Sequence, residues 1–323
     1  MEMKKVVILV AGLFLAFTGL SARGAEYPDK PIQLVLPFAP GGSGDFTARL
    51  LAEKMSPLLG QPVWVQNKPG AGGSIGASYV GTSKPDGYTL LITASGAFVI
   101  LPLAASDIPY KTSDFVPIGR VAICPYLLVV NKDMPAKSLR DLIAYVKKNP
   151  ASVSYGASGV GSNNQLLAEL LKQDAHISAQ FIPYGGEPPT LTALLGNNIH
   201  YAILTLPTCL PHVKSGVIRA LAITSAKREP LYPQVPTFAE QGFPEMVGYN
   251  IFILLAPSKT PAPVVRKLEN VLEKILQDEG VKQRIEATLQ RVDFKNSADT
   301  QAFLESEAKK WVSVIKAAGI VIK

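Results

Sequence analysis

The chain has 323 residues, of which 47% are hydrophobic and 18% are charged, with 26 glycines, 26 prolines and a formal net charge of +7. This length is enough for about two domains with separate hydrophobic cores, and the composition excludes a disordered chain and a small disulfide-stapled fold. Basic residues cluster only as pairs such as Lys147-Lys148, so no long basic run indicates nucleic-acid binding, and the mild positive charge fits a small anionic ligand better.

The first 24 residues have the three-part pattern of a secretory signal peptide. Met1 to Lys5 is short and basic, 6–20 is an apolar run, and Ala22-Arg23-Gly24 places small residues at a cleavage site. The apolar run is short for a membrane span, which needs about 20 residues. The sequence therefore predicts a signal peptide over 1–24 and a periplasmic mature protein, with an uncleaved anchor as the alternative.

Strand-like apolar runs alternate with helical patterns along the chain, which is typical of α/β units around mainly parallel sheets. The predicted strands are 32–38, 62–67, 88–93, 121–131 and 152–156. The predicted helices are 45–59, 74–82, 139–148, 163–172, 263–277 and 301–316. In the last helix one face carries a stripe that predicts core packing rather than an aromatic binding platform: Leu304, Ala308, Trp311 and Ile315.

Two glycine-rich segments, 38–45 and 155–163, each join a predicted strand to a predicted helix. A helix start leaves about four backbone N–H groups without partners and carries partial positive charge, so it attracts an anion. Two such loops together predict one ligand held from two sides. The alternative is that each loop only makes a tight turn and that Asp45 caps its own helix.

Gly72-Gly73-Ser74-Ile75-Gly76 matches the Gly-x-Ser-x-Gly nucleophile pattern of hydrolases, and the three histidines all lie downstream. The preceding loop, 68–71, is longer than the sharp turn that holds such a nucleophile, so a structural helix start is favoured over catalysis at Ser74. No nucleotide-binding or metal-binding spacing occurs, and the sequence predicts no metal and no cofactor.

Cys124 and Cys209 are the two cysteines, and each lies in an apolar segment. In an oxidising compartment they could pair as a disulfide. Buried free thiols are the favoured alternative, because free cysteine is commonly buried.

Ordered similarity over nearly the whole mature chain links it to a known family. The sequence resembles the solute receptors of tripartite tricarboxylate transporters, the Bug family. The segments that carry the resemblance are 27–32, 37–45, 65–73, 84–90, 114–118, 155–162, 182–184, 210–213, 219–222 and 236–237.

The resemblance implies a two-lobed, type II periplasmic-binding-protein fold of the α/β class, with a mainly parallel sheet and flanking helices in each lobe. Lobe 1 would comprise 25–125 plus 249–323 and lobe 2 would comprise 126–248, with 121–131 and 249–257 as crossing strands. In this family the two loops grip a ligand carboxylate, partly through water. The candidate ligand-binding residues are Phe38, Gly41, Gly42, Ser43, Asp45, Ser95, Tyr155, Ser158, Gly159, Gly161, Ser162, Asn163 and Thr205.

The chain departs from the family pattern in the second lobe. Gly185 stands where members often carry Lys, and 202–207 has no acid where many relatives have Asp before the Leu-Pro pair. In amino-acid-binding relatives an acid from this lobe can receive the ammonium group. Its absence favours a ligand without an amine, such as a di- or tricarboxylate or an aromatic acid.

The expected function is that of a non-enzymatic, monomeric receptor that passes a small carboxylate to integral-membrane transporter subunits. Two alternatives stay open. One is an exported serine hydrolase that uses Ser74. The other is a sensory receptor with the same fold and a signalling partner, because fold alone does not separate these functions.

Overall fold

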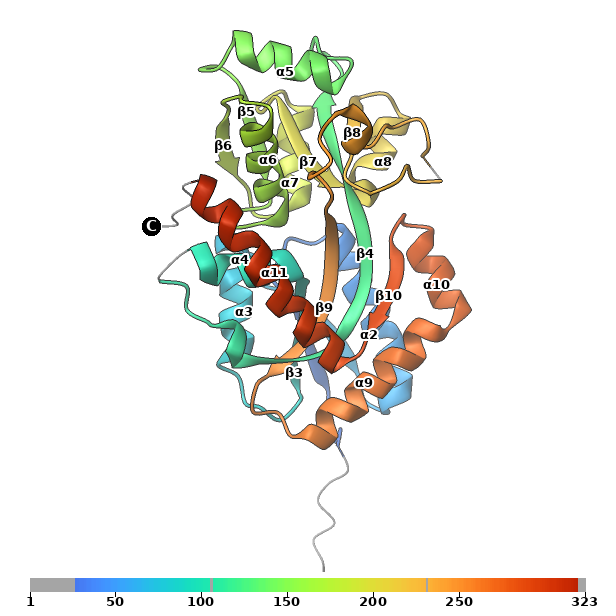
Figure 1. Cartoon of the computed structure of the whole chain (residues 1–323). Helices are drawn as coiled ribbons and strands as arrows, with labels where there is room; N and C mark the ends of the chain where they lie inside the picture. Colours follow the sequence, from blue (N-terminus) through green and yellow to red (C-terminus); the bar gives the residue numbers. More distant parts are fainter. Residues whose placement is uncertain (1–26, 105–106, 231, 319–323) are drawn as a thin grey trace, which may run out of the picture.

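The computed structural model describes residues 27–104, 107–230 and 232–318, so the predicted signal peptide over 1–24 lies outside the described residues. Two α/β lobes are joined by long strands that pass between them (Figure 1). The predicted two-lobed α/β fold is confirmed. Within the described ranges, no helix is both long enough and apolar enough to cross a membrane.

The first lobe is built on a sheet with the strand order β2-β1-β3-β9-β4, with β10 also paired to β4. Its strands are β1 Ile32–Leu36, β2 Val63–Asn67, β3 Thr89–Ala94, β4 Phe115–Asn131, β9 Tyr249–Pro257 and β10 Arg291–Lys295. The helices of this lobe are α2 Ser43–Leu59, α3 Ser74–Gly81, α4 Ser95–Ala104, α9 Ala262–Gln277, α10 Glu279–Glu286 and α11 Ser297–Ala318.

The second lobe repeats this plan with the order β4-β7-β5-β6, and β8 also pairs with β4. Its strands are β5 Ser154–Ala157, β6 Gln180–Pro183, β7 Tyr201–Thr205 and β8 Ile218–Ile223. Its helices are α5 Leu139–Lys148, α6 Asn163–Asp174, α7 Glu187–Leu195 and α8 Leu206–Lys214. Short 3₁₀ helices span Ala71–Gly73, Thr112–Asp114 and Ala239–Gln241.

Each sheet is mixed, which corrects the expectation of mainly parallel sheets. Three parallel strands form the outer part of each sheet, β2-β1-β3 in the first lobe and β6-β5-β7 in the second. The long strands β4 and β9 add antiparallel pairs to these parallel strands. The antiparallel pairs arise because the chain leaves the first lobe along β4 and returns along β9.

β4 belongs to both sheets and marks the boundary between the lobes. Its pairing with β9 ends at Pro125 opposite Tyr249, and the next residue, Tyr126, pairs with Thr205 of β7. The change of partner falls between residues 125 and 126 of β4. The lobe bounds that the family resemblance implies, with crossings near residues 125 and 248, stay a prediction.

Most of the strands are buried on both faces, as expected for strands covered by helices, whereas β2, β6 and β10 are only partly buried. In β1, Ile32 and Leu34 pack into one hydrophobic cluster of the first lobe, whereas Val35 points to the opposite face and packs into another. The second lobe has two corresponding clusters, on the two faces of its own sheet.

A fifth cluster joins the two lobes, and we call it the seam cluster. It consists of Ile100 and Ala104 of α4, Leu166 of α6, and Trp311 and Ile315 of α11. Because α4 belongs to the first lobe and α6 to the second, α11 packs against both. The predicted core stripe on this last helix is confirmed, since its four members are buried or partly buried: Leu304, Ala308, Trp311 and Ile315.

Both cysteines are free and buried, so the favoured interpretation is confirmed. Cys124 packs in a cluster of the first lobe and Cys209 in a cluster of the second. Burial raises the pKa of both thiols well above the ordinary value, and both therefore stay protonated.

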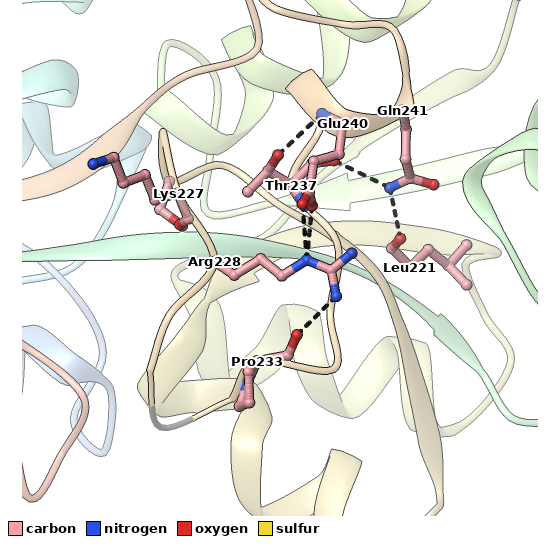
Figure 2. A network of polar contacts seen from close by, with 8 residues as sticks. Leu221, Lys227, Arg228, Pro233, Thr237, Glu240 and Gln241 are labelled. Atoms are coloured by element: carbon pink, nitrogen blue, oxygen red, sulfur yellow. Dashed lines mark hydrogen bonds and ion pairs between the residues drawn. The ribbon is translucent and has the colours of Figure 1, made fainter.

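A polar network holds the connection between β8 and β9 (Figure 2). Arg228 Nε donates to both carboxylate oxygens of Glu240, at 3.0 and 2.9 Å. The Thr237 N–H donates to Glu240, and the Glu240 N–H donates to the Thr237 hydroxyl, so the two residues are held reciprocally. Gln241 Nε2 donates to the carbonyl of Leu221 in β8, which ties the connection to the sheet.

Candidate ligand-binding site

A cavity of about 50 Å³ lies between the two lobes, beside the crossing strands. A single water molecule needs roughly 10–15 Å³ of such space, so the cavity accepts only a small molecule. The residues that line it are Phe38, Ala39, Gly42, Ser43, Gly44, Asp45, Ala94, Ala97, Tyr126, Ser158, Ser162, Asn163, Asn164, Glu187, Pro188, Asn250 and Phe252.

The first wall of the cavity contains the N-terminus of α2. Gly42 precedes this helix in an extended conformation, and no side chain caps the helix. The backbone N–H groups of Ser43 and Gly44 have no hydrogen-bond partner among the described residues. Both residues line the cavity, so they offer an anion two donors at the positive end of the helix dipole.

Asp45 does not cap α2, and this resolves the alternative left open by the sequence. Its carboxylate accepts hydrogen bonds from the N–H of Gly41 at 3.2 Å, from Arg49 Nε at 2.9 Å and from Asn67 Nδ2 at 3.1 Å. Burial by itself would raise the pKa of Asp45, but these donors outweigh it and hold the pKa below its ordinary value. Asp45 therefore fixes the shape of the loop and is not free to bind a ligand.

Asp45→Asn is expected to lower the free energy of unfolding by about 1–2 kcal/mol at pH 7, because it removes the charge from hydrogen bonds that three residues donate and that are partly screened by solvent. The folded-state pKa is depressed, so this contribution is present above the unfolded-state value of about 3.9 and is lost as the pH falls below it. Urea unfolding measures the difference in the free energy of unfolding between Asp45→Asn and wild type, and this difference should be smaller at pH 3 than at pH 7.

The control for this prediction is Asp133→Asn, which removes an exposed carboxylate paired only with its neighbour Lys132. It should change stability by less than about 0.5 kcal/mol at either pH. Equal destabilisation by Asp45→Asn at both pH values would contradict the assigned role.

The second wall contains the N-terminus of α6 and the glycine-rich loop before it. Side chains from the first turn of the helix hold this loop. Asn164 accepts from the N–H of Ser158 at 3.3 Å and donates to its hydroxyl at 2.9 Å, and Gln165 accepts from the N–H of Gly161 at 2.6 Å. The N–H groups of Ser158 and Gly161 are therefore occupied. The backbone N–H groups of Asn163 and Asn164, two residues that line the cavity at the helix start, have no hydrogen-bond partner among the described residues and can bind a ligand.

Two buried polar atoms near the cavity have no hydrogen-bond partner among the described residues: Ser95 Oγ and Asn163 Oδ1. Leaving such a group unpaired costs about 1–3 kcal/mol. The Asn163 amide lies directly against Gly96, at a distance that a Cβ would not permit, so a glycine at position 96 makes room for it. Unpaired buried polar groups are typical of a site that a ligand completes.

An acidic side chain from the second lobe also reaches the cavity. Glu187 is the first residue of α7 and is only partly exposed. Its carboxylate accepts hydrogen bonds from the N–H of Thr205 at 2.9 Å, from the Thr205 hydroxyl, and from the Thr208 hydroxyl at 2.6 Å. Burial raises the pKa of Glu187, and the three donors only partly offset it.

The lobes touch one another around the cavity. The backbones of Gly72 and Gly159 lie so close that a Cβ on Gly159 would be 2.8 Å from the Cα of Gly72. The Thr205 and Ser43 hydroxyl oxygens, from different lobes, lie 3.4 Å apart. The structure is therefore that of the closed form.

The structure brings seven of the predicted site residues into the cavity wall: Phe38, Gly42, Ser43, Asp45, Ser158, Ser162 and Asn163. The other six lie outside the wall: Gly41, Ser95, Tyr155, Gly159, Gly161 and Thr205. Of these six, Gly41 and Gly161 give their N–H groups to side chains of the adjoining helices, and Thr205 contacts Glu187.

Tyr155 does not form a wall of the site. It is fully buried in the core of the second lobe, where its ring stacks at 5.3 Å from Phe181 and 5.5 Å from Tyr201, and its hydroxyl donates to Glu169. Tyr155 lies within β5, one residue before Gly156. Its side chain packs into the hydrophobic cluster that contains residues of α5 and α6, and it does not reach the cavity wall.

Sequence reasoning missed several residues of the wall. Tyr126 and Asn250 lie on the crossing strands, so the predicted crossing points near 125 and 248 were a usable signal for them. Glu187 and Pro188 lie in a segment for which no helix was predicted, and only tertiary structure brings them to the loops.

Ser74 begins α3, is 3% exposed, and has no hydrogen bond to a histidine among the described residues. His200 is engaged elsewhere, since its Nδ1 accepts from the N–H of Ser154 at 3.1 Å. The geometry is that of a structural helix start. In the part of the chain that the structure describes, no three His, Cys, Asp or Glu side chains are grouped to hold a metal ion.

A two-lobed α/β fold whose helix N-termini face a closed cavity defines a ligand-binding protein of the periplasmic-binding type. The family model of the tripartite tricarboxylate transporter family receptors, TctC, matches residues 47–320. The chain belongs to this family.

Relatives and solved structures agree with the family model. Protein BugT of Bordetella pertussis is 37% identical over 321 residues, which cover 98% of both chains. The structure of the periplasmic binding protein BugD is 34% identical, with a TM-score of 0.87 over 92% of this chain and 100% of BugD. The structure of R. palustris Rpa4515 with adipate is also 34% identical, with a TM-score of 0.88 over 92% of this chain and 99% of the other.

Proposed function

We propose that this protein is a monomeric periplasmic receptor that captures a small organic carboxylate between its lobes and delivers it to membrane subunits of a tripartite tricarboxylate transporter. One observation carries the proposal. Unpartnered N–H groups at the start of α2 and at the start of α6 face the same cavity from different lobes. Among the residues that the structure describes, no lysine, arginine or histidine lines the cavity, so the helix N-termini supply its partial positive charge.

Simple energetics support a mechanism in which the lobes close. Four N–H donors to a charged group supply roughly 6–12 kcal/mol at about 1.5–3 kcal/mol each. Association costs about 4–15 kcal/mol, whereas micromolar binding needs a net free energy of about −8 kcal/mol. The four donors alone do not supply this net free energy. Closure of the lobes must therefore bury apolar surface and exclude water, and Phe38 and Phe252 of the wall contribute to the apolar burial.

The relatives support the cellular setting of the proposal. Rpa4515 was solved with adipate, a carboxylate, and BugD is described as a periplasmic binding protein. The signal-peptide pattern over 1–24 agrees with export. A receptor in that compartment needs a membrane partner to move its ligand into the cell, and the family name supports a transporter in that role.

A thermal-shift screen of mono-, di-, tri- and aromatic carboxylates tests the proposal. A ligand that binds only the folded state stabilises it, by about 2.7 kcal/mol at a concentration of 100 times Kd. At least one carboxylate should raise Tm in a concentration-dependent manner, whereas neutral sugars of similar size should not. Failure of every carboxylate, confirmed by calorimetry, would contradict the proposal.

A further inference from the structure

Glu187 enters the cavity through a specific local geometry. Gly186 precedes it with a φ of +141°, a conformation that favours glycine, and Pro188 and Pro189 follow it in the first turn of α7. The side chain is thus placed at the second-lobe side of the cavity, beside Pro188.

The carboxylate of Glu187 has neutral partners only. It accepts hydrogen bonds from the backbone and hydroxyl of Thr205 and from the hydroxyl of Thr208, which occupy three of its roughly four acceptor positions. Among the described residues it forms no ion pair, whereas Asp45, the other carboxylate of the wall, pairs with Arg49. One acceptor position is therefore left for a ligand, and no cation among the described residues balances the charge of the ionised carboxylate.

We infer that Glu187 receives the ammonium group of a zwitterionic ligand whose carboxylate is bound by the N-termini of α2 and α6. An ammonium group donates to the remaining acceptor position and neutralises a carboxylate that no protein cation neutralises. A hydroxyl in its place would form the hydrogen bond and leave the charge uncompensated. The inference deepens the proposed function and rests on it.

The spacing of the two subsites defines the ligand further. The Thr205 hydroxyl contacts Glu187 on one side and the Ser43 hydroxyl, at 3.4 Å, on the other. A single hydroxyl therefore separates the acidic side chain from the start of α2, where the carboxylate is held. The carboxylate and the ammonium group of a ligand that fills both subsites therefore belong on the same carbon, as in a small α-amino acid.

The inference differs from the sequence argument, which favours a ligand without an amine. That argument rested on the absence of an acid within 202–207, and the segment indeed has none. Glu187 reaches the cavity from the start of α7 and hydrogen-bonds Thr205, a residue of that segment. The acid is present in the lobe, on a different element.

Calorimetry with matched pairs of compounds tests the inference: L-aspartate with succinate, L-glutamate with glutarate, and L-alanine with propionate. Each pair differs only in the amino group. At least one amino acid should bind the wild-type protein ten-fold or more tightly than its partner. In Glu187→Gln, which keeps size and removes the charge, that preference should fall below about three-fold, while the affinity for the deaminated partner stays within three-fold.

Two further variants control for folding. Glu187→Asp keeps the charge and should retain a preference for the amino acid, and Glu245→Gln alters an exposed acid of the same lobe and should bind like wild type. Equal weakening of both members of a pair in Glu187→Gln would assign Glu187 a structural role and overturn the inference.

The remaining outcomes separate the two proposals. Tighter binding of the deaminated acids by the wild-type protein would overturn the inference, because it implies a protonated Glu187 that donates to a second carboxylate, and it would leave the receptor function standing. Failure of all six compounds to bind, together with a negative carboxylate screen, would overturn both.

Discussion

Gly72→Ala is expected to weaken ligand binding at least 100-fold without unfolding the protein. Gly72 lies in the 3₁₀ turn before α3, and a Cβ at this position would overlap the backbone carbonyl oxygen of Val160 in the second lobe. A backbone atom cannot rotate away, so the lobes would stay apart. A ligand would then lose about two charged hydrogen bonds from one lobe, roughly 3–6 kcal/mol, which corresponds to a 100-fold or larger loss of affinity.

Gly60→Ala provides a matched control. Gly60 ends α2 with a φ of +69°, close to the +66° of Gly72, but nothing lies within 4 Å of its added Cβ. Both variants should lose about 1 kcal/mol of stability from left-handed backbone strain, and only Gly72→Ala should lose binding. Calorimetry with a carboxylate that the thermal-shift screen identifies measures the affinity of both variants. Wild-type affinity in Gly72→Ala would show that ligand binding does not need the contact between the lobes at Gly72.

Trp311→Ala is expected to reduce the free energy of unfolding by about 3–5 kcal/mol, the usual cost of removing a buried tryptophan. Trp311 is 3% exposed and packs in the seam cluster, so its loss leaves a cavity between α11, α4 and α6. Urea unfolding followed by circular dichroism gives the midpoint and slope.

The chain's other tryptophan is the control for this measurement. Trp64 lies on the edge strand β2 and is 47% exposed, so Trp64→Ala should change stability by less than about 0.5 kcal/mol. Similar effects of the two substitutions would show that the seam cluster adds little to stability.

Elements with clear periodicity or clear boundaries were predictable from sequence. α5 spans Leu139–Lys148 as predicted, because its apolar positions recur at helical spacing and Asn149-Pro150 ends it. β4 begins six residues earlier than predicted, at Phe115, because Pro117 and Gly119 interrupt the apolar pattern. Both interruptions coincide with a shift in its register against β9.

Other elements carried no usable pattern. α4 is buried almost all around, so its apolar residues show no period, and α7 and α8 contain prolines in or near their first turns. β10 is short and only partly buried. Tertiary packing, rather than local preference, determines these elements.

The two glycine-rich loops and the N–H donors at the helix starts could be predicted from sequence. The sequence did not show that side chains of Asp45, Asn164 and Gln165 would occupy other N–H groups of the loops. Glu187 escaped notice because folding of the second lobe brings it to 155–163 and contact between the lobes sets its distance from 38–45. No local signal encodes that distance.

The seam cluster opposes the separation of the two lobes. Any movement that separates Leu166 on α6 from Trp311 on α11 would expose the indole and its neighbours to water. Exposing about 40 Å² of apolar surface costs roughly 1 kcal/mol. We therefore expect the contact between α6 and α11 to oppose a wide opening of the empty protein. The C-terminal helix would in this way act as a tether between the lobes.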